Sequence, residues 1–241
     1  FKSKSYKDIL NKVDAVSIVT PTITHYKIAK FFLQNKKHVL LEKPMTETVG
    51  QASLINKIAK KNKCILQIGH LEQFNPAIKK LKSQLKNPEF IEVHRLCKFN
   101  PRATDVDVVL DLMIHDIDIV LSGKKVITEL IDIANVRIEF KNNVVANLTA
   151  SRISTKNERK MRIFLKNSYY SVDFINNELK KLNKNKNNTF KHIDYKFKKS
   201  DSLRGEINNF IKACYGKEKS VTTGVEGQKA LAVAKKITRN L

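Results

Sequence analysis

The feature of this chain that most constrains its fold is an alternation of short apolar runs and helix-like segments over the first 75 residues. The apolar runs, rich in β-branched and aliphatic residues, predict strands at 15–19, 38–41 and 64–68. Apolar residues at helical spacing between them predict helices at 25–35 and 46–61, the second with Thr46 as its N-cap. Strands that alternate with helices form a parallel α/β sheet with right-handed crossovers.

The glycine pattern of a complete dinucleotide-binding domain is missing. Such domains usually carry G-x-G-x-x-G at the first strand–helix turn, where backbone amides hold a pyrophosphate. None of the seven glycines forms this pattern, and the first residue is Phe1 rather than methionine. We therefore expect that a first strand, the glycine-rich loop and a second strand were lost from this chain. The alternative is a domain that never bound a dinucleotide.

After Pro76 the sequence is dominated by successive hairpins. Helices are predicted at 76–85 and 108–121, and strands at 90–96, 126–136, 137–140, 144–151, 161–165 and 169–174. The Lys/Asn-rich tract at 180–188 predicts a solvated surface loop, and 190–197 alternates like an edge strand. Two helices, 202–215 and 226–241, complete the chain.

These segments predict an α/β protein with two domains. The first is an incomplete doubly wound, Rossmann-like parallel sheet at 1–75, rejoined by the C-terminal helix 226–241. The second, at 76–225, is an α+β domain with a mainly antiparallel sheet, suited to substrate binding and oligomerisation. An uncovered sheet face would expose more apolar surface than monomers usually do, so we expect a homo-oligomer formed through that sheet.

Charge and cysteine content narrow the function classes. The formal net charge is +23, but 38 lysines outnumber 8 arginines and lie scattered in Lys/Asn runs. This pattern disfavours a nucleic-acid partner, for which arginine is the preferred contact, and remains compatible with an anionic substrate. Cys64, Cys97 and Cys214 have no paired spacing, which predicts neither disulfides nor zinc and fits a reducing cytoplasm. The absence of an apolar run of about 20 residues predicts no membrane span.

The segment with the clearest chemical content lies in the helix predicted at 108–121. Spacings of four and seven residues put Asp111, His115 and Asp118 along one face of an otherwise apolar helix. A histidine one turn from a carboxylate is suited to act as the general base of an alcohol oxidation. Two alternatives remain open. Asp111 forms a local cap or salt bridge beside a structural His115, or, less favoured, there is a metal site, for which no further His or Cys cluster is present.

Two further segments follow predicted parallel strands, where open α/β sheets bind ligands. Lys43, in Glu42-Lys43-Pro44, is placed to donate to a substrate hydroxyl and stabilise developing negative charge. A restricted or cis Lys43–Pro44 bond would fix the direction of its side chain. Thr20, Pro21 and His25 follow the preceding strand and suit a ribose or nicotinamide edge. The alternative for each is an ordinary surface or turn residue.

Taken in order, these motifs resemble the Gfo/Idh/MocA oxidoreductases. The segment from Asp14 through Thr20-Pro21 to His25 is similar to the family's strand and turn beside the cofactor, and Glu42-Lys43-Pro44 matches its E-K-P signature. Asp111, His115 and Asp118 match its D-x-x-x-H-x-x-D helix. The resemblance implies hydride transfer from a sugar or nucleotide-sugar hydroxyl to NAD or NADP.

The same resemblance implies a role for each matching residue. Lys43 would contact the substrate hydroxyl, His115 would accept its proton and Asp111 would orient His115. Thr20, Pro21, His25, Glu42 and Lys43 would line the cofactor. A ligand-sensing protein of the same fold, or a remnant unable to bind cofactor, are the alternatives.

Residues 69–76 and 102–111 further resemble a bacterial subgroup associated with 3-dehydrogenation of UDP-N-acetylglucosamine. This similarity adds Gln73 and Arg102 to the expected substrate contacts. Gln73 stands where the family usually has arginine, which changes any anion contact from that position. No phosphate-binding residues carry over, because the glycine-rich loop is absent.

Overall fold

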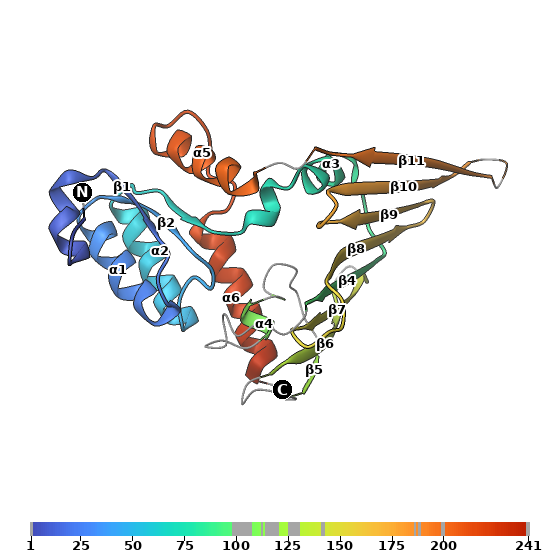
Figure 1. Ribbon diagram of the computed structural model, residues 1–241, viewed down its shortest axis with the longest axis horizontal. Helices are drawn as coiled ribbons and strands as arrows, with labels where there is room; N and C mark the ends of the chain where they lie inside the picture. Colours follow the sequence, from blue (N-terminus) through green and yellow to red (C-terminus); the bar gives the residue numbers. More distant parts are fainter. Residues whose placement is uncertain are drawn as a thin grey trace. The chain divides into compact units, whose positions relative to one another are not determined.

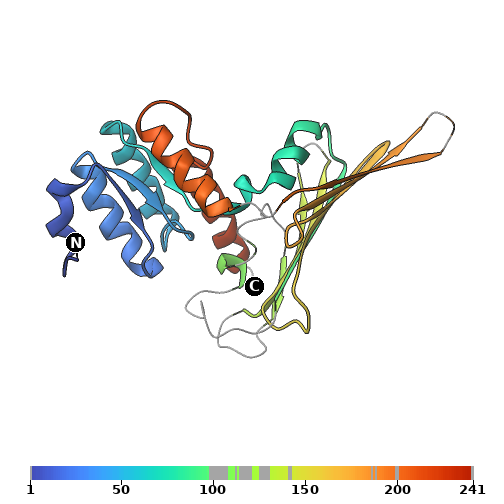
Figure 2. The ribbon, with the colours of Figure 1, turned by 45° about the horizontal axis from the view of Figure 1, so that its top comes forward.

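The computed structural model describes residues 2–97, 108–111, 113, 121–124, 131–140, 143–185, 187, 189–198 and 201–239. The chain divides into two compact units (Figures 1 and 2). The first comprises Phe1–Leu71 and Leu203–Ala232, and the second comprises Glu72–Ser202 and Val233–Leu241. The first unit is therefore assembled from two stretches of chain that most of the second unit separates in sequence.

The first unit contains a three-stranded parallel sheet. Its strands are β1 (Ala15–Ile18), β2 (His38–Leu41) and β3 (Leu66–Ile68), and β2 lies in the middle. Helix α1 (Thr22–Gln34) connects β1 to β2, and α2 (Val49–Lys61) connects β2 to β3. A short 3-10 helix, η1 (Tyr6–Lys12), precedes the sheet and packs Tyr6 against the aromatic rings of α1. The predicted parallel α/β arrangement is confirmed.

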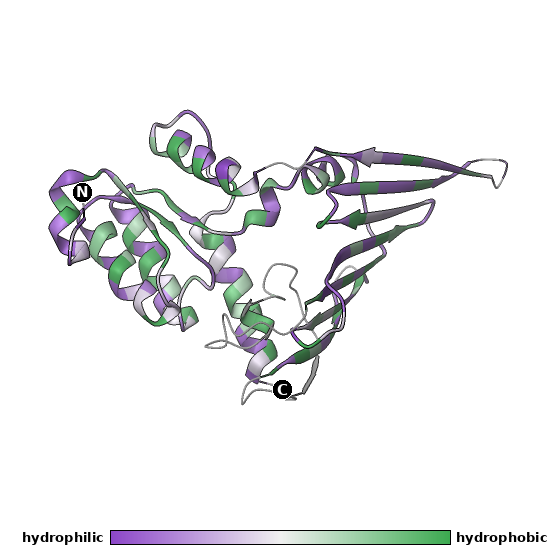
Figure 3. Ribbon diagram, in the orientation of Figure 1, coloured by the Kyte–Doolittle hydropathy of each residue, from purple (hydrophilic) through white to green (hydrophobic). Residues whose placement is uncertain are grey.

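Burial explains why these short runs form strands. Val39, Leu41 and Ile68 are fully buried, as expected for strands that helices cover. Helices α1 and α2 pack side by side, and each bears hydrophobic residues along one stripe (Figure 3). The buried side chains of the two helices are Ala29, Phe32, Leu33, Ala52, Ile55 and Ala59.

Helix α2 begins at Val49, so the predicted N-cap at Thr46 is wrong. Thr48 is the N-cap: its hydroxyl accepts the Gln51 backbone N–H at 3.2 Å, and the Gln51 side chain accepts the Thr48 N–H at 3.3 Å. This reciprocal capping box satisfies two backbone donors at once, which a cap at Thr46 would not. Thr46 instead donates to the Thr48 carbonyl.

The C-terminal part of the first unit packs against both faces of strand β3. Helix α6 (Gly224–Arg239) approaches one face so closely that a Cβ on Gly227 would lie 2.5 Å from Ile68 Cγ1. From the other face, the fully buried Gln67 donates to the Glu206 carbonyl in α5 (Ser202–Cys214) at 3.2 Å. Gln67 also accepts from the Ser220 hydroxyl at 2.8 Å. Distant segments of sequence thus complete this sheet.

The second unit contains a mixed sheet. Its described strands are β4 (Phe90–Leu96), β5 (Leu121–Lys124), β6 (Ile133–Glu139), β7 (Val145–Ser151), β8 (Glu158–Leu165), β9 (Ser168–Asp173), β10 (Glu178–Lys184) and β11 (Phe190–Lys196). Their spatial order is β11-β10-β9-β8-β4-β7-β6-β5. Only the β4–β7 pair among these described strands is parallel. The predicted mainly antiparallel sheet is confirmed, with β11 at its edge as expected.

The Lys/Asn-rich tract forms most of β10, so its prediction as a surface loop is wrong. Leu179 is fully buried, and the Lys181 ammonium lies 5.2 Å from the centre of the Tyr170 ring. Glu178 pairs with Lys196 of β11 at 3.3 Å. Lysine stems can cover a sheet while their charges reach water, so a lysine-rich composition does not exclude a strand.

Two other predicted boundaries differ from the structure. Leu121 begins strand β5 rather than ending a helix, because Leu121–Lys124 pairs with β6. The strands predicted at 126–136 and 137–140 are replaced by the single described strand β6. Continuous antiparallel pairing with β7 supplies the hydrogen bonds that extend β6 through this region.

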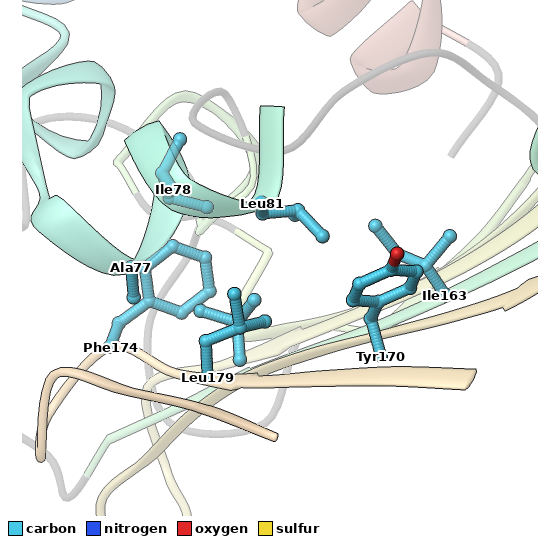
Figure 4. Packing of buried hydrophobic residues seen from close by; sticks show 8 residues of the cluster. Ala77, Ile78, Leu81, Ile163, Tyr170, Phe174 and Leu179 are labelled. Atoms are coloured by element: carbon cyan, nitrogen blue, oxygen red, sulfur yellow. The ribbon is translucent and has the colours of Figure 1, made fainter. Parts of the chain in front are cut away.

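Helix α3 (Pro76–Gln84) forms the main core of the second unit with the sheet. Asn75 caps this helix and Pro76 occupies its first turn, as the sequence predicted for Pro76. The side chains that meet between α3 and strands β8 to β10 are Ala77, Ile78, Leu81, Ile163, Tyr170, Val172, Phe174 and Leu179, most of them labelled in Figure 4. The Tyr170 hydroxyl points toward the end of α3 and donates to the Gln84 carbonyl.

Candidate active site

The three parallel strands of the first unit end together, because Ile18 pairs with Leu41 and Leu41 pairs with Ile68. The turns after these strands hold Thr20-Pro21, Glu42-Lys43-Pro44 and Gly69-His70. Open α/β sheets bind their ligands beyond the carboxyl ends of the strands. The structure therefore brings the predicted residues of the first unit to the edge where such a site forms.

His25, in α1, holds the first two turns together. Its side chain is 1% exposed, with Nδ1 2.9 Å from the Pro44 carbonyl oxygen and Nε2 2.8 Å from the Thr20 carbonyl oxygen. The hydroxyls of Thr20 and Thr24 lie 2.6 Å apart beside them. Main-chain groups thus engage both ring nitrogens of His25. In the structure His25 therefore connects these two turns. The predicted contact between His25 and the cofactor stays a prediction.

Glu42 is the carboxylate at the centre of this edge. Its Oε2 accepts the Lys43 backbone N–H at 3.1 Å. A Cβ on Gly69 would lie 2.9 Å from the same oxygen, so a larger residue at this position would displace the end of the Glu42 side chain. Glu42 therefore lies between the turns that follow β2 and β3. The Lys43–Pro44 bond beside it is cis.

Two ionisable side chains near this edge were not among the predicted site residues. Burial, and secondly the Lys43 cation, lower the pKa of His70 to about 4. Burial, and secondly the Glu42 charge, raise the pKa of Glu206 to about 7. Glu206 is 1% exposed and shares its helix face with Asn209, Phe210 and Ala213. A glutamate on the apolar stripe of a helix was the sequence signal that would have identified it.

The remaining predicted site residues belong to the second unit. Gln73 lies in the short 3-10 helix η2 (Leu71–Phe74), where its side-chain oxygen accepts from the Lys82 ammonium. Asp111 ends the described helix α4 (Val108–Asp111), which packs on β6 and β7. Arg102 and His115 lie outside the described residues. The predicted roles of these residues stay predictions.

Two classes of site are not found in the described part of the chain. No group of three or more His, Cys, Asp or Glu side chains there is arranged to hold a metal ion. None of the helices within the described ranges is long and apolar enough to cross a bilayer.

The sequence is similar to that of known oxidoreductases. Residues 2–70 match the model of the "Oxidoreductase family, NAD-binding Rossmann fold". The chain is 36% identical, over 94% of its length and 78% of the relative's, to UDP-N-acetylglucosamine 3-dehydrogenase of Acidithiobacillus ferrooxidans. It is 25% identical, over 95% of its length and 79% of the relative's, to myo-inositol 2-dehydrogenase of Thermotoga maritima.

Solved structures agree with these matches. The Acidithiobacillus ferrooxidans enzyme superposes with a TM-score of 0.92 at 34% identity, covering 99% of this chain and 82% of that one. Levoglucosan dehydrogenase in complex with NADH superposes with a TM-score of 0.88 at 14% identity, covering 98% of this chain and 80% of that one. At that low identity the second match shows the fold alone.

The parallel sheet, the motifs at its carboxyl edge and these relatives define an NAD(P)-dependent dehydrogenase with a Rossmann-type domain. The chain belongs to the Gfo/Idh/MocA family of oxidoreductases, and its cofactor is NAD or NADP.

Proposed function

We propose that this chain oxidises a ring hydroxyl of a nucleotide sugar, and that the 3-hydroxyl of UDP-N-acetylglucosamine is the group oxidised. The observation that carries this proposal is the 36% identity to an enzyme named for that reaction, over 78% of that enzyme. The E-K-P motif at the carboxyl edge of the sheet is compatible with it. The net charge of +23 also suits an anionic diphosphate substrate.

The proposed chemistry divides among three side chains. His115 accepts the proton of the sugar hydroxyl, Asp111 orients His115, and the Lys43 ammonium donates to the sugar oxygen and stabilises its developing negative charge. Gln73 and Arg102 are proposed to contact the nucleotide sugar. In this assignment, residues 1–75 with 226–241 serve as the dinucleotide-binding domain and residues 76–225 as the substrate-binding domain.

The groups at the carboxyl edge of the first unit fit the nicotinamide end of a dinucleotide. A hydroxyl on Thr20, a carboxylate on Glu42 and an ammonium on Lys43 offer polar contacts at adjoining turns. The bound dinucleotide supplies the hydride acceptor. With no G-x-G-x-x-G among its seven glycines, the chain offers no residue for assignment to the diphosphate.

Stopped-flow measurement of nicotinamide reduction with UDP-sugars tests the proposal. We expect turnover with UDP-N-acetylglucosamine and a loss of at least about 100-fold in kcat for a Lys43→Ala, His115→Ala double variant, because it removes both the base and the oxygen donor. The matched control is Lys60→Ala, His192→Ala, which changes an exposed lysine and an exposed histidine. Wild-type rates in the first double variant would contradict the proposed roles.

Binding measurements separate the alternatives. Saturable thermal stabilisation by NAD⁺ or NADP⁺ is expected, because a ligand that binds the folded state raises its stability. Stabilisation by dinucleotide and UDP-sugar without any turnover would favour a ligand-sensing protein. No stabilisation by either dinucleotide would favour a chain that does not hold cofactor.

We also propose that copies of this chain associate in the cytoplasm through the face of the large sheet opposite α3. That face bears the adjacent rings of Phe90, Phe164 and Tyr169, with Phe164 37% exposed. Beside them the Arg162 guanidinium donates to Glu92 at 2.7 Å. Sedimentation velocity should show a smaller species for Phe164→Glu, whereas Ile175→Glu, in the exposed β9–β10 turn, should not change the mass. An unchanged mass in both variants would contradict this face as the interface.

A further inference from the structure

The first unit holds a buried carboxyl group for which neither the family motifs nor the proposed reaction provides a role. Glu206 of α5 is 1% exposed, and its Oε1 has no hydrogen-bond partner among the described residues. Burying an ionised carboxylate without partners is costly, so a buried glutamate of this kind needs an explanation. A glutamine or leucine would fill a similar volume without that cost.

The backbone around Glu206 fixes where its side chain can act. The fully buried Gln67 donates to the Glu206 carbonyl at 3.2 Å, and Gln67 in turn accepts from Ser220 at 2.8 Å. These bonds hold this turn of α5 against β3. Because β3 pairs with β2 and both strands end together, Glu206 is held near the edge formed by their turns.

The neighbouring charge that acts on Glu206 is the Glu42 carboxylate. Glu42 lies close to both turns, because its Oε2 accepts the Lys43 N–H at 3.1 Å and is so near Gly69 that a Cβ there would lie 2.9 Å away. Two neighbouring carboxylates repel one another when both are ionised, the more so where one of them is buried. Ionisation of Glu206 therefore places a second negative charge near the Glu42 carboxylate, which a proton on Glu206 avoids.

Two other ionisable groups of the first unit have a partner or no charge at neutral pH. His70, after β3, remains neutral because burial and the Lys43 cation lower its pKa to about 4. Glu218, in the turn after α5, is paired with Lys212 at 2.5 Å. Among the groups named here, Glu206 is the one whose protonation changes between pH 6 and 8, since burial and the Glu42 charge raise its pKa to about 7.

We propose that Glu206 is a positioning residue for Lys43 and acts on it through Glu42. The inference rests on the proposed function, in which Lys43 donates to the sugar oxygen. In its neutral form Glu206 keeps the Glu42 carboxylate against Gly69 and the Lys43 amide, so the ammonium is held at the edge where the substrate reacts. Ionisation of Glu206 releases this restraint and slows the reaction without removing any group that touches the substrate.

Carbon-13 NMR of glutamate-labelled full-length chain tests the pair directly. The carboxyl signal that disappears in Glu206→Gln should titrate near pH 7, and the signal assigned through Glu42→Gln should shift in the same step. Titration of Glu206 below pH 5, or a Glu42 signal that ignores the Glu206 step, would overturn the inference. Glu47→Gln, an exposed glutamate five residues after Glu42, is the matched control and should alter neither signal.

The pH profile of turnover provides the second measurement. The kcat of the wild-type chain, relative to that of Glu206→Gln, should fall about tenfold between pH 6 and pH 8.5, because the glutamine cannot ionise. Glu206→Ala should lower kcat at every pH, and Glu206→Gln should restore it. Identical pH profiles for wild type and Glu206→Gln would also overturn the inference. Absence of turnover in the wild type would count against the proposed function alone, since the NMR titration does not depend on it.

Discussion

Replacing Glu206 by glutamine should make the first unit more stable at alkaline pH. Glutamine keeps the size and hydrogen-bonding capacity of the protonated side chain but has no charge to bury. In the folded chain, burial and the Glu42 charge raise the pKa of Glu206 from its ordinary value of 4.5 to about 7. The two-and-a-half-unit difference corresponds to about 3 kcal/mol, at about 1.4 kcal/mol per unit.

The free energy of unfolding of the wild type falls as the pH rises, because the folded chain binds the Glu206 proton more tightly than the unfolded chain does. Between pH 4.5 and 7 the folded chain keeps the proton of Glu206 that the unfolded chain has already released. The wild-type stability therefore falls through this window and stays low above it. At pH 5 the wild type and Glu206→Gln should differ by less than about 1 kcal/mol, and at pH 8 the variant should be more stable by about 3 kcal/mol.

Hydrogen exchange of the amides in β2 and β3 measures this difference inside the first unit. At pH 8 these amides should exchange on the order of 100-fold more slowly in Glu206→Gln than in wild type, if they exchange through opening of the whole unit. Amides of β9 and β10, in the other unit, serve as an internal reference. Glu47→Gln should leave all rates unchanged. Equal rates in wild type and Glu206→Gln at pH 8, or an equal gain at pH 5, would refute the reasoning.

Three further substitutions test the packing. Gly227→Ala should lower the free energy of unfolding by about 1–3 kcal/mol, because its Cβ would lie 2.5 Å from Ile68 Cγ1; an unchanged melting temperature would contradict this close approach. Leu179→Ala removes a fully buried side chain and should cost about 2–5 kcal/mol in urea unfolding, whereas a solvated loop at this position would show almost no loss. Glu72→Ala removes the carboxylate 3.1 Å from the buried Arg95 and should cost about 1–3 kcal/mol, with a smaller effect arguing that other contacts of Arg95 dominate.

The first unit was predictable from the sequence because its signals are local. The runs that became β1, β2 and β3 are short, apolar and bounded by turn residues, so the parallel sheet followed from the alternation. The start of α2 was placed two residues too early because Thr46 and Thr48 are both acceptable N-caps. Only the reciprocal bond with Gln51 distinguishes them.

The second unit was less predictable because pairing partners decide its strands. The lysines of β10 suggested a loop. In the structure Leu179 of β10 is buried, and the Lys181 ammonium of β10 lies over the Tyr170 ring of the neighbouring strand β9. Residues 121–124 form a strand because they pair with β6, and no local sequence pattern predicted this pairing. Strand propensity depends on such neighbours more than helix propensity does.

The candidate site was predictable in part. Motif order was enough to select Lys43 and Glu42, which the structure puts at the carboxyl edge of the sheet. The contribution of Glu206 depends on a helix 164 residues further along the chain than Glu42, so no short motif contained it. His115 lies outside the described residues, and its role remains a prediction.

The first unit consists of two stretches of chain that are far apart in sequence, and this affects folding during synthesis. The three parallel strands are synthesised before residues 206–220, so Gln67 can bond to the Glu206 carbonyl and to Ser220 only after that later segment has been made. Until then β3 lacks the segment 203–232 that contacts it, and its apolar side chains are open to chaperones or aggregation. A premature stop codon before residue 203 would therefore remove the contacts that complete the β3 side of the NAD-binding Rossmann region at residues 2–70.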